Sequence, residues 1–500
     1  MTHTLSRAAA CLALAGAFAS VSPAALAVSH VFLVQNSGWM EPFYTDPASQ
    51  YKPLVTELVM AVTRPGDRMV LAAFNQGLPD APSPRALLSL KVEDKPARDR
   101  VQGALAKLEV ARKPGSAVMA DTDLNEAVSG AIDSALGGKP GLVWLFTNNR
   151  NSPNNDQETA VRNRDFYQLI HRGSKITRAL AFPLRMPVQG TYYKANGLMI
   201  YVFAVGAQGA RELKTLVASG AIANVVTEPP ARLKPLDQDT VRLVPRKVSD
   251  APGVAFSITA GGMLRADVQP GATTPRANIE WNLENTMYPY TIAGATVSAR
   301  SKLAGDDRPI RLASSRVGSI APGKSAPLSS TMELPVRQLP SAWSMEAIRS
   351  AGSDFVMPGA IQIELTGQRL ELSQAFRQRM ASLFPGDPLP EIFTPPAQIK
   401  SSTVLLPIEV RVAYGVGPLL SLIAGVLALL GALAAAALAL ARPRKALVTV
   451  EDELRTMHGR AGSSQPIFDK AGNKVAQLKI TLFGHELVDL REGAQVRLGR

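Results

Sequence analysis

The sequence predicts a doubly wound, Rossmann-like α/β domain, followed by an all-β sandwich and one membrane-spanning helix. Three observations support this order. Apolar runs alternate with amphipathic stretches over residues 28–235, short strand-like segments separated by turns fill 236–411, and an uncharged apolar segment covers 412–441. Strands that alternate with helices favour a sheet with helices on both faces, whereas repeated short strands favour a sandwich.

The composition excludes several classes of protein. Lys and Arg number 54 against 41 Asp and Glu, yet no run of five basic residues occurs, which argues against nucleic acid as a partner. The one cysteine, Cys11, lies in a segment expected to be removed, so the mature chain has no disulfide and no thiol nucleophile. Only His30 and His171 lie in the predicted exported part, too few for a multi-histidine metal site.

The N-terminus has the three parts of a secretory signal peptide. Arg7 provides the basic start, residues 8–21 form an apolar run, and Ala25-Leu-Ala27 matches the small-residue cleavage pattern. We expect cleavage after Ala27, so that residues 1–27 are absent from the mature protein. An uncleaved anchor is the alternative.

A second apolar segment predicts a membrane helix. A helix over 412–441 at about 1.5 Å per residue is about 45 Å long, more than the roughly 30 Å hydrocarbon core of a bilayer. Basic residues mark the cytoplasmic side of such a helix. Three basic residues directly follow the apolar segment: Arg442, Arg444 and Lys445. We therefore predict a single-pass protein of the cytoplasmic (inner) membrane, with residues 28–411 periplasmic or extracytoplasmic and 442–500 cytoplasmic.

Residues 28–235 contain predicted strands and helices in alternation. Apolar runs predict strands at His30–Val34, Met69–Phe74, Leu142–Phe146, Ile176–Pro183 and Leu198–Val205. Apolar residues at helical spacing predict helices around 51–62, 101–108, 124–131 and 211–218. This alternation predicts a mostly parallel sheet, and ligands bind such sheets at the carboxyl ends of the strands.

Four segments at the predicted strand ends form a recognisable pattern. They are Phe32–Met40, Gly66–Asn75, Asp121–Ala127 and Leu145–Asn149. Together they resemble the opening strand, second strand, threonine loop and Leu-Thr-Asp-Gly strand end of a von Willebrand factor type A domain. The resemblance implies the doubly wound fold of that family, in a bacterial membrane protein.

The resemblance also implies a site. The family's metal-ion-dependent adhesion site uses Asp-x-Ser-x-Ser, a distant Thr and a distant Asp. Ser37 and Thr122 match this pattern, whereas Gln35, Trp39 and Asn148 replace the first Asp, the second Ser and the last Asp. Neutral oxygens hold Mg²⁺ poorly. We therefore expect a degenerate ligand-binding face without metal or cofactor; the alternative is a weak Mg²⁺ site at Ser37, Thr122 and Asn148.

Two features of this predicted site have two interpretations each. Asp121 and Asp123 either replace the missing carboxylates or cap the helix that follows, which is the commoner role for such residues. Trp39 is either an exposed anchor for a partner, since tryptophan is enriched at interface hot spots, or a filler of the vacated metal cavity. The sequence leaves the choice for Trp39 open.

Residues 236–411 predict an immunoglobulin-like sandwich with Trp281 in its core and an amphipathic helical insertion at Leu372–Phe384. Within this region, Gly318–Ser325 fits the phosphate-loop pattern by letter. That pattern binds nucleotide only where a glycine loop opens a helix, and here strand-like residues follow. A Pro-Gly turn between two strands explains the same letters, so we expect no bound nucleotide.

The tail, residues 442–500, contains segments that alternate like strands. Its ending, Leu490–Arg500, resembles the opening of a forkhead-associated domain, a family that reads phosphothreonine. The Ser and Asn that do so in the family would come later in the sequence. Two alternatives stay open, a small β-rich appendage or a domain that continues past residue 500.

Together these patterns predict a protein that is not an enzyme. Residues 28–411 contain no cysteine, no Gly-x-Ser-x-Gly elbow and no His-Glu-x-x-His motif. The leading hypothesis is a membrane-anchored, adhesion-type module that binds a protein or cell-envelope ligand outside the cytoplasm. The alternatives are a transmembrane sensor that couples the exported domain to the forkhead-associated-like tail, and a periplasmic hydrolase.

Overall fold

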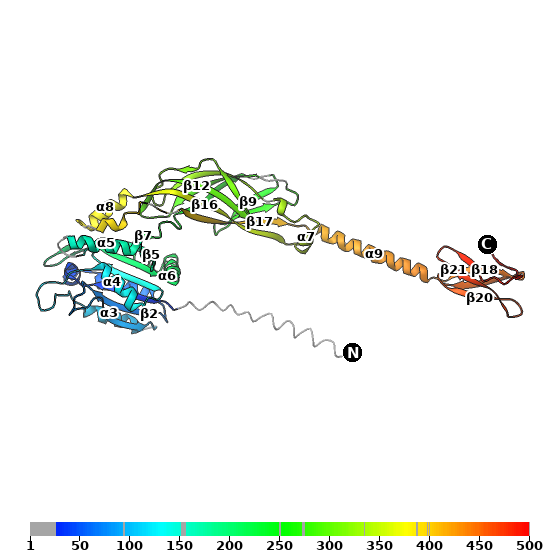
Figure 1. The fold of residues 1–500 in the computed structure, drawn as a ribbon, viewed down its shortest axis with the longest axis horizontal. Coiled ribbons are helices and arrows are strands. Elements are labelled where there is room, and N and C mark those ends of the chain that lie inside the picture. Colours follow the sequence, from blue (N-terminus) through cyan, green and yellow to red (C-terminus); the bar gives the residue numbers. More distant parts are fainter. Residues whose placement is uncertain are drawn as a thin grey trace. The chain divides into compact units, whose positions relative to one another are not determined.

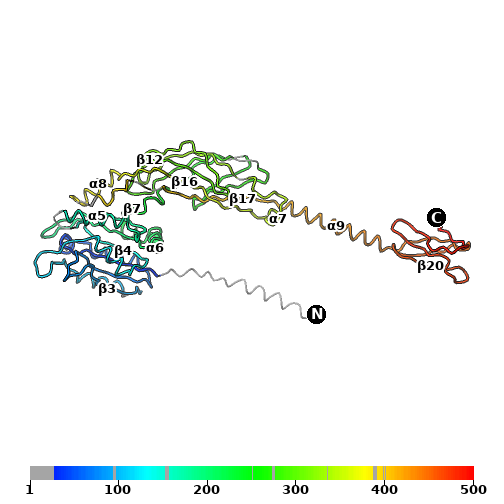
Figure 2. The backbone as a smooth tube through the Cα atoms, viewed as in Figure 1, coloured from blue at the N-terminus to red at the C-terminus, as the bar shows by residue number. Residues whose placement is uncertain are grey.

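The computed structural model describes residues 27–499 except 94–95, 152–156, 250–251, 273–275, 335, 387–388, 398 and 400. The course of the backbone is coloured from blue at the N-terminus to red at the C-terminus (Figure 1, Figure 2). The chain divides into two compact units. In their described parts, one contains Met1–Ala266, Thr274–Pro335 and Met357–Val410, and the other Asp267–Thr273, Val336–Val356 and Arg411–Arg500. The predicted signal peptide lies outside the described residues, apart from Ala27.

A seven-stranded sheet organises the first part of the chain. Its strands are β1 (Ser29–Gln35), β2 (Arg68–Phe74), β3 (Arg85–Lys91), β4 (Gly141–Thr147), β5 (Ile176–Gln189), β6 (Lys194–Val205) and β7 (Ala231–Lys234). They are ordered β3-β2-β1-β4-β6-β5-β7. β1 pairs in parallel with β2 and β4, and the other neighbours pair antiparallel.

The prediction of a mostly parallel sheet is therefore wrong. β5 and β6 are antiparallel because only residues 190–193 join them, and Gly190 N donates to Tyr193 O at 2.9 Å to close the turn. A parallel pair needs a crossover of roughly a dozen residues or more. The two apolar runs that predicted these strands marked only the ends far from the turn, so the hairpin between them was missed.

Helices cover both faces of this sheet. One face packs against α1 (Glu41–Thr45), α2 (Tyr51–Val62), α3 (Pro96–Ala106) and α6 (Gly206–Ala218). The other packs against α4 (Leu124–Gly130), the π-helical turn Ala131–Ala135, α5 (Gln157–His171) and α8 (Gln374–Leu383). Strand residues alternate between the faces, as Phe32 and Leu33 do. Helical periodicity predicted α2, α3, α4 and α6, but α5 was missed although Phe166 and Ile170 are buried at helical spacing.

A second sheet of ten strands follows in sequence. Its strands are β8 (Val241–Ser249), β9 (Val254–Ile258), β10 (Leu264–Val268), β11 (Arg276–Asn285), β12 (Tyr290–Leu303), β13 (Asp306–Leu312), β14 (Arg316–Val317), β15 (Ser325–Glu333), β16 (Asp354–Leu372) and β17 (Ser402–Ala413). Burial alternates along β11 and β12, so one face of each packs inside. Trp281 is buried there, as predicted, and its Nε1 donates to Ser330 Oγ at 2.7 Å.

Two smaller predictions about this region are confirmed. The segment that fits the phosphate-loop pattern forms a turn, in which Lys324 N donates to Ala321 O at 3.0 Å, and strand β15 follows it. The predicted insertion contains α8. Further short helices in the described part of this region are η3 (Val336–Gln338), α7 (Met345–Arg349) and η4 (Leu389–Phe393), whereas η1 (Gly38–Met40) follows β1 in the first part of the chain.

The predicted membrane helix is present as α9 (Gly417–Ala441). In the described part of the chain it is the one helix long and apolar enough to cross a membrane, and nothing described buries it. It begins at Gly417 rather than at residue 412, because β17 continues to Ala413 and Pro418 favours a helix start. The charge-free segment therefore predicted the presence of the helix but not its first residue.

The tail after α9 is a folded β structure. Its two three-stranded sheets are ordered β19-β18-β23 and β20-β21-β22. The strands are β18 (Arg444–Val450), β19 (Glu453–Gly459), β20 (Ser464–Phe468), β21 (Lys474–Ile480), β22 (His485–Val488) and β23 (Val496–Leu498). Apolar side chains of both sheets, among them Val448 and Leu478, form one buried core.

Candidate functional site

The five residues predicted to form the ligand-binding face lie around the carboxyl ends of β1 and β4. Gln35 ends β1, Ser37 and Trp39 follow it, Asn148 follows β4, and Thr122 precedes α4. Because β1 and β4 are parallel neighbours, their carboxyl ends meet at one edge of the sheet. Four of the five side chains are buried, and Trp39 is half-buried.

The side-chain amide of Gln35 is the centre of this site. Its Nε2 donates to Ser37 Oγ at 2.7 Å and to Thr122 Oγ1 at 2.9 Å, and these two hydroxyl oxygens are 2.5 Å apart. Its Oε1 accepts from Thr147 Oγ1 at 2.5 Å and from the backbone N–H of Asn148 at 3.1 Å. A backbone N–H is always a donor, so this contact determines which amide atom is the oxygen. The amide NH₂ group therefore faces the hydroxyl oxygens of Ser37 and Thr122.

Further hydrogen bonds hold this network in place. The hydroxyls of Tyr44 and Tyr51 donate to the backbone oxygen of Gln35 at 2.8 Å and 3.1 Å. Burial raises the pKa of both tyrosines, so both keep their protons at neutral pH. Asn148 Nδ2 donates to the backbone oxygen of Trp39 at 3.0 Å. The polar groups of the site therefore bond to each other, which is the usual state of buried polar groups.

Carboxylates do not converge on this network. Asp123 Oδ1 accepts from the backbone N–H of Glu126 at 2.9 Å and caps α4, which confirms the capping prediction for Asp123. Asp121 instead pairs with Lys113, with Oδ2 and Nζ 2.7 Å apart. Across the residues that the structure describes, no three His, Cys, Asp or Glu side chains form a group able to hold a metal ion. The oxygens at the predicted site are those of neutral hydroxyls and amides.

Trp39 lies where the buried network meets the surface. The guanidinium carbon of Arg150 is 4.7 Å from the centre of the Trp39 ring, and the ring of Tyr193 is 4.5 Å away, centre to centre, tilted by 41°. Such cation–π and aromatic contacts hold a ring in one orientation. The Trp39 Nε1 has no hydrogen-bond partner among the described residues. The Gln35 amide, and not this ring, faces the Ser37 and Thr122 hydroxyls.

A cavity of about 660 Å³ opens beside Trp39. Its lining includes aromatic rings and both signs of charge: Trp39, Tyr193, Arg112, Lys113, Asp121, Glu158 and Arg162. Several of its charges are paired, since Arg162 contacts Glu158 and lies 3.7 Å from Asp123. Tyr192, also in the lining, is 68% exposed. The cavity is therefore a polar hollow with an aromatic edge rather than a strongly cationic one.

Several residues of this surface were not predicted from the sequence. Arg162 belongs to α5, the helix that was missed, and Tyr192 and Tyr193 lie in the unpredicted turn between β5 and β6. Turns favour Gly, Asn and Asp, so two consecutive tyrosines after Gly190 are a signal that could have drawn attention to this turn. For Arg150 the sequence offers no comparable signal.

Comparison with known protein families and with curated protein sequences finds no match for this chain. The chemistry of the site therefore follows from its geometry. Neither His30 nor His171 lines the cavity beside Trp39. What remains is an uncharged, internally bonded network beneath a rim of tryptophan, tyrosine and arginine.

Proposed function

We propose that this protein is a non-enzymatic, membrane-anchored binding module, and that the surface around Trp39 contacts a protein or cell-envelope ligand. One observation carries the proposal. The polar residues beneath the surface are hydrogen-bonded to each other, whereas the half-buried Trp39 and the exposed Tyr192 border a cavity. Trp, Tyr and Arg contribute most often to binding energy at protein interfaces. This arrangement favours the anchor interpretation of Trp39 over the filler interpretation.

We propose a von Willebrand factor type A-like fold for the first domain and an immunoglobulin-like sandwich for the second. The order β3-β2-β1-β4 and the helices on both faces support the doubly wound interpretation. The antiparallel β6, β5 and β7 depart from a parallel sheet. The alternating burial of β11 and β12 supports the sandwich.

We further propose that recognition proceeds without a metal ion. A cation between Ser37 and Thr122 would have to displace the Gln35 amide, whose hydrogens already face both hydroxyl oxygens. The alternative weak Mg²⁺ site at Ser37, Thr122 and Asn148 contains no carboxylate, and hard cations depend on carboxylates for charge.

We propose that α9 spans the cytoplasmic membrane, with residues 28–411 outside and 442–500 inside. Its 25 residues at about 1.5 Å each give about 37 Å, enough for the roughly 30 Å hydrocarbon core. The basic residues that follow α9 support this orientation. The sensor alternative is favoured by one observation, the folded core of the tail. Deletion of residues 446–500 separates the two, because an anchor still binds and functions without them, whereas a sensor binds but fails to signal.

Quantitative capture from envelope membranes tests the binding proposal. Full-length protein in nanodiscs serves as bait, with Trp39→Ala and Tyr192→Ala as test variants. Trp343→Ala is the matched control, because Trp343 is an exposed tryptophan that does not line this cavity. We expect a ligand that wild type and the control retain and both test variants lose. Equal capture by all four proteins contradicts the proposal.

A further inference from the structure

The turn between β21 and β22 carries two outward-facing apolar side chains. Phe483 is 99% exposed and Leu482 is 52% exposed, and no other large apolar side chain in the described residues is more than 68% exposed. The turn is well bonded, since both the backbone N–H and the hydroxyl of Thr481 donate to Gly484 O, at 2.8 Å and 3.0 Å. Turns usually carry Gly, Asn, Asp or Ser at their tips. A leucine and a phenylalanine held in water at this position need an explanation.

This turn is attached to the residue with which the tail begins. Arg444 Nη1 donates to the backbone oxygens of Leu482 at 2.8 Å and Thr481 at 3.4 Å. Only Arg442 and Pro443 separate Arg444 from the last residue of α9. Three residues of extended chain reach at most about 10 Å. The apolar tip therefore lies close to the end of the apolar helix.

The charged residues of the tail are also distributed unevenly between the end next to α9 and the opposite end. Basic residues gather at the end next to α9: Arg442, Arg444, Lys445 and Arg460, the last of which follows the strand partner of Arg444. Glu486 is an acidic exception near this end, and it lies opposite Lys479 in the register of the hairpin. The tail is thus basic where the apolar tip lies.

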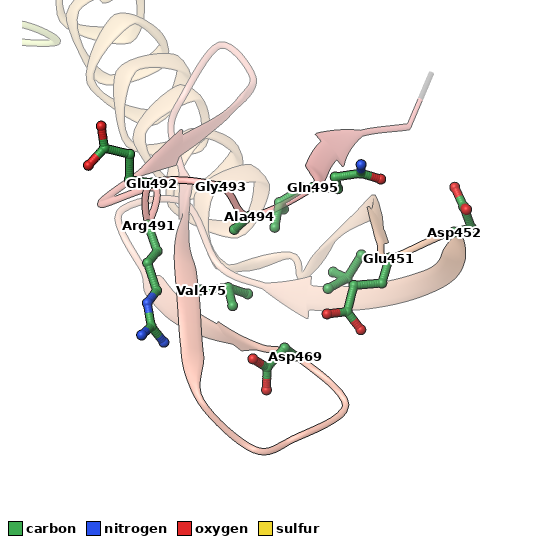
Figure 3. A pocket seen from close by; sticks show the side chains of 11 residues that line it. Glu451, Asp452, Asp469, Val475, Arg491, Glu492, Gly493, Ala494 and Gln495 are labelled. Atoms are coloured by element: carbon green, nitrogen blue, oxygen red, sulfur yellow. The ribbon is translucent and has the colours of Figure 1, made fainter.

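The opposite end of the tail is acidic. It holds a cavity of about 560 Å³, whose described lining includes four carboxylates and one cation, Arg491 (Figure 3). The carboxylates belong to Glu451, Asp452, Asp469 and Glu492. Strand β18 runs from Arg444 to Val450 between the two ends, a distance of about 20 Å at roughly 3.3 Å per residue. The tail therefore has a basic end next to α9 that carries its most exposed apolar side chain, Phe483, and an acidic end away from it. Some carboxylates of the acidic end are paired, since Glu453 contacts Arg455 and Lys470.

We propose that Leu482 and Phe483 insert into the headgroup region of the membrane that α9 spans, so that the tail docks on the lipid surface with its basic end. This inference rests on the proposed membrane span. Aromatic and apolar side chains partition into the interface, and basic residues next to a span are attracted to anionic lipids of the cytoplasmic leaflet. The acidic cavity then faces away from the lipid, as electrostatic repulsion requires. The tail is thereby held in one orientation instead of swinging freely from α9.

Lipid quenching of site-specific labels tests the docking. Full-length protein with Cys11→Ser is reconstituted into nanodiscs that contain anionic lipid and nitroxide-labelled lipid. A polarity-sensitive fluorophore is attached to one of three cysteine variants: Phe483→Cys, Phe468→Cys or Leu430→Cys. Phe468 is the matched control, an exposed phenylalanine at the acidic end of the tail. Leu430, in the middle of α9, reports whether that helix is in the bilayer.

The outcomes separate this inference from the membrane anchor. We expect quenching at position 430, and several-fold stronger quenching at 483 than at 468. Equal quenching at 483 and 468, with 430 quenched, overturns the docking and leaves the membrane span intact. Absence of quenching at 430 overturns the span and the docking together.

Discussion

The side-chain nitrogen of Gln35 lies 2.9 Å from Thr122 Oγ1 and donates a hydrogen bond to it across 87 positions of the sequence. This contact joins the end of β1 to the segment that precedes α4. A buried polar group that loses its partner costs about 1–3 kcal/mol. The network that we propose excludes a cation from this site therefore also stabilises this edge of the sheet.

Substitution of Gln35 tests both roles of the network. Gln35→Glu replaces the amide donor with a buried carboxylate of the same shape. We expect local stability to fall by about 2–3 kcal/mol, because a buried charge lacks a counter-charge. We also expect millimolar Mg²⁺ to restore part of the loss, since a carboxylate beside two hydroxyls is a better cation ligand.

Hydrogen exchange of peptides from β1 and residues 116–124 measures the effect of Gln35→Glu with and without Mg²⁺. Gln76→Glu is the matched control, because it makes the same chemical change at a partly exposed position on the cavity. A Gln35→Glu protein as stable as wild type, and indifferent to Mg²⁺, contradicts this account of the network.

The wild-type protein should not bind divalent cations at this site. Two neutral hydroxyls and an amide offer no negative charge, and the amide hydrogens occupy the approach to both hydroxyls. Titration calorimetry of the full-length protein with Mg²⁺ and with Mn²⁺ should give only heats of dilution. Low-micromolar affinity that disappears in Ser37→Ala would show that the site holds a metal after all.

Trp39→Ala should change local stability by only about 1 kcal/mol. The ring is half-buried, and its contacts with Arg150 and Tyr193 are worth about that much. Trp144→Ala is the contrasting control, because that ring is fully buried and its removal should cost about 3–5 kcal/mol. Hydrogen exchange across β1 and β4 provides the comparison. A loss at Trp39 as large as at Trp144 would favour the filler interpretation.

His30 should make this domain less stable in mild acid. Burial lowers the pKa of His30 from 6.5 to about 4; nearby Asp67 partly opposes this, and Arg64 adds to it. Its Nδ1 accepts from Trp144 Nε1 at 3.4 Å, so the neutral ring is the form that fits. The unfolded chain binds the proton more tightly than the folded one. Stability is therefore fully present above about pH 6.5 and is lost as pH falls toward 4.

The expected loss from His30 between pH 7 and pH 5 is about 2 kcal/mol. Hydrogen exchange in β1 and β4, corrected for the intrinsic exchange rate at each pH, measures it. His30→Asn is the control, since its amide oxygen still accepts from Trp144 but does not titrate. Burial also lowers the pKa of His171, so the stability of the His30→Asn variant keeps a smaller dependence on pH. The same pH dependence in wild type and His30→Asn would exclude His30 as the cause.

Local patterns in the sequence were sufficient to predict several helices and strands. The apolar spacing of Tyr51–Val62 predicted α2, the charge-free segment predicted α9, and the residues around Gln35 and Asn148 were expected to meet because parallel strands share an edge. Periodicity reports which side of an element is buried, and that information is carried by neighbouring residues alone.

Only the tertiary structure decided the pairing of β5 with β6, the contacts of Arg150 and Tyr193 with Trp39, and the hydrogen-bond partners of Gln35. The sequence by itself determined which residue types were available at the site, and so the presence of Gln35 and Asn148 where the pattern that it resembles has carboxylates. It did not determine which groups replace them as partners. Hydrogen bonds and ring contacts between distant segments depend on how the whole sheet is assembled. The spacing of neighbouring residues in the sequence does not determine that assembly.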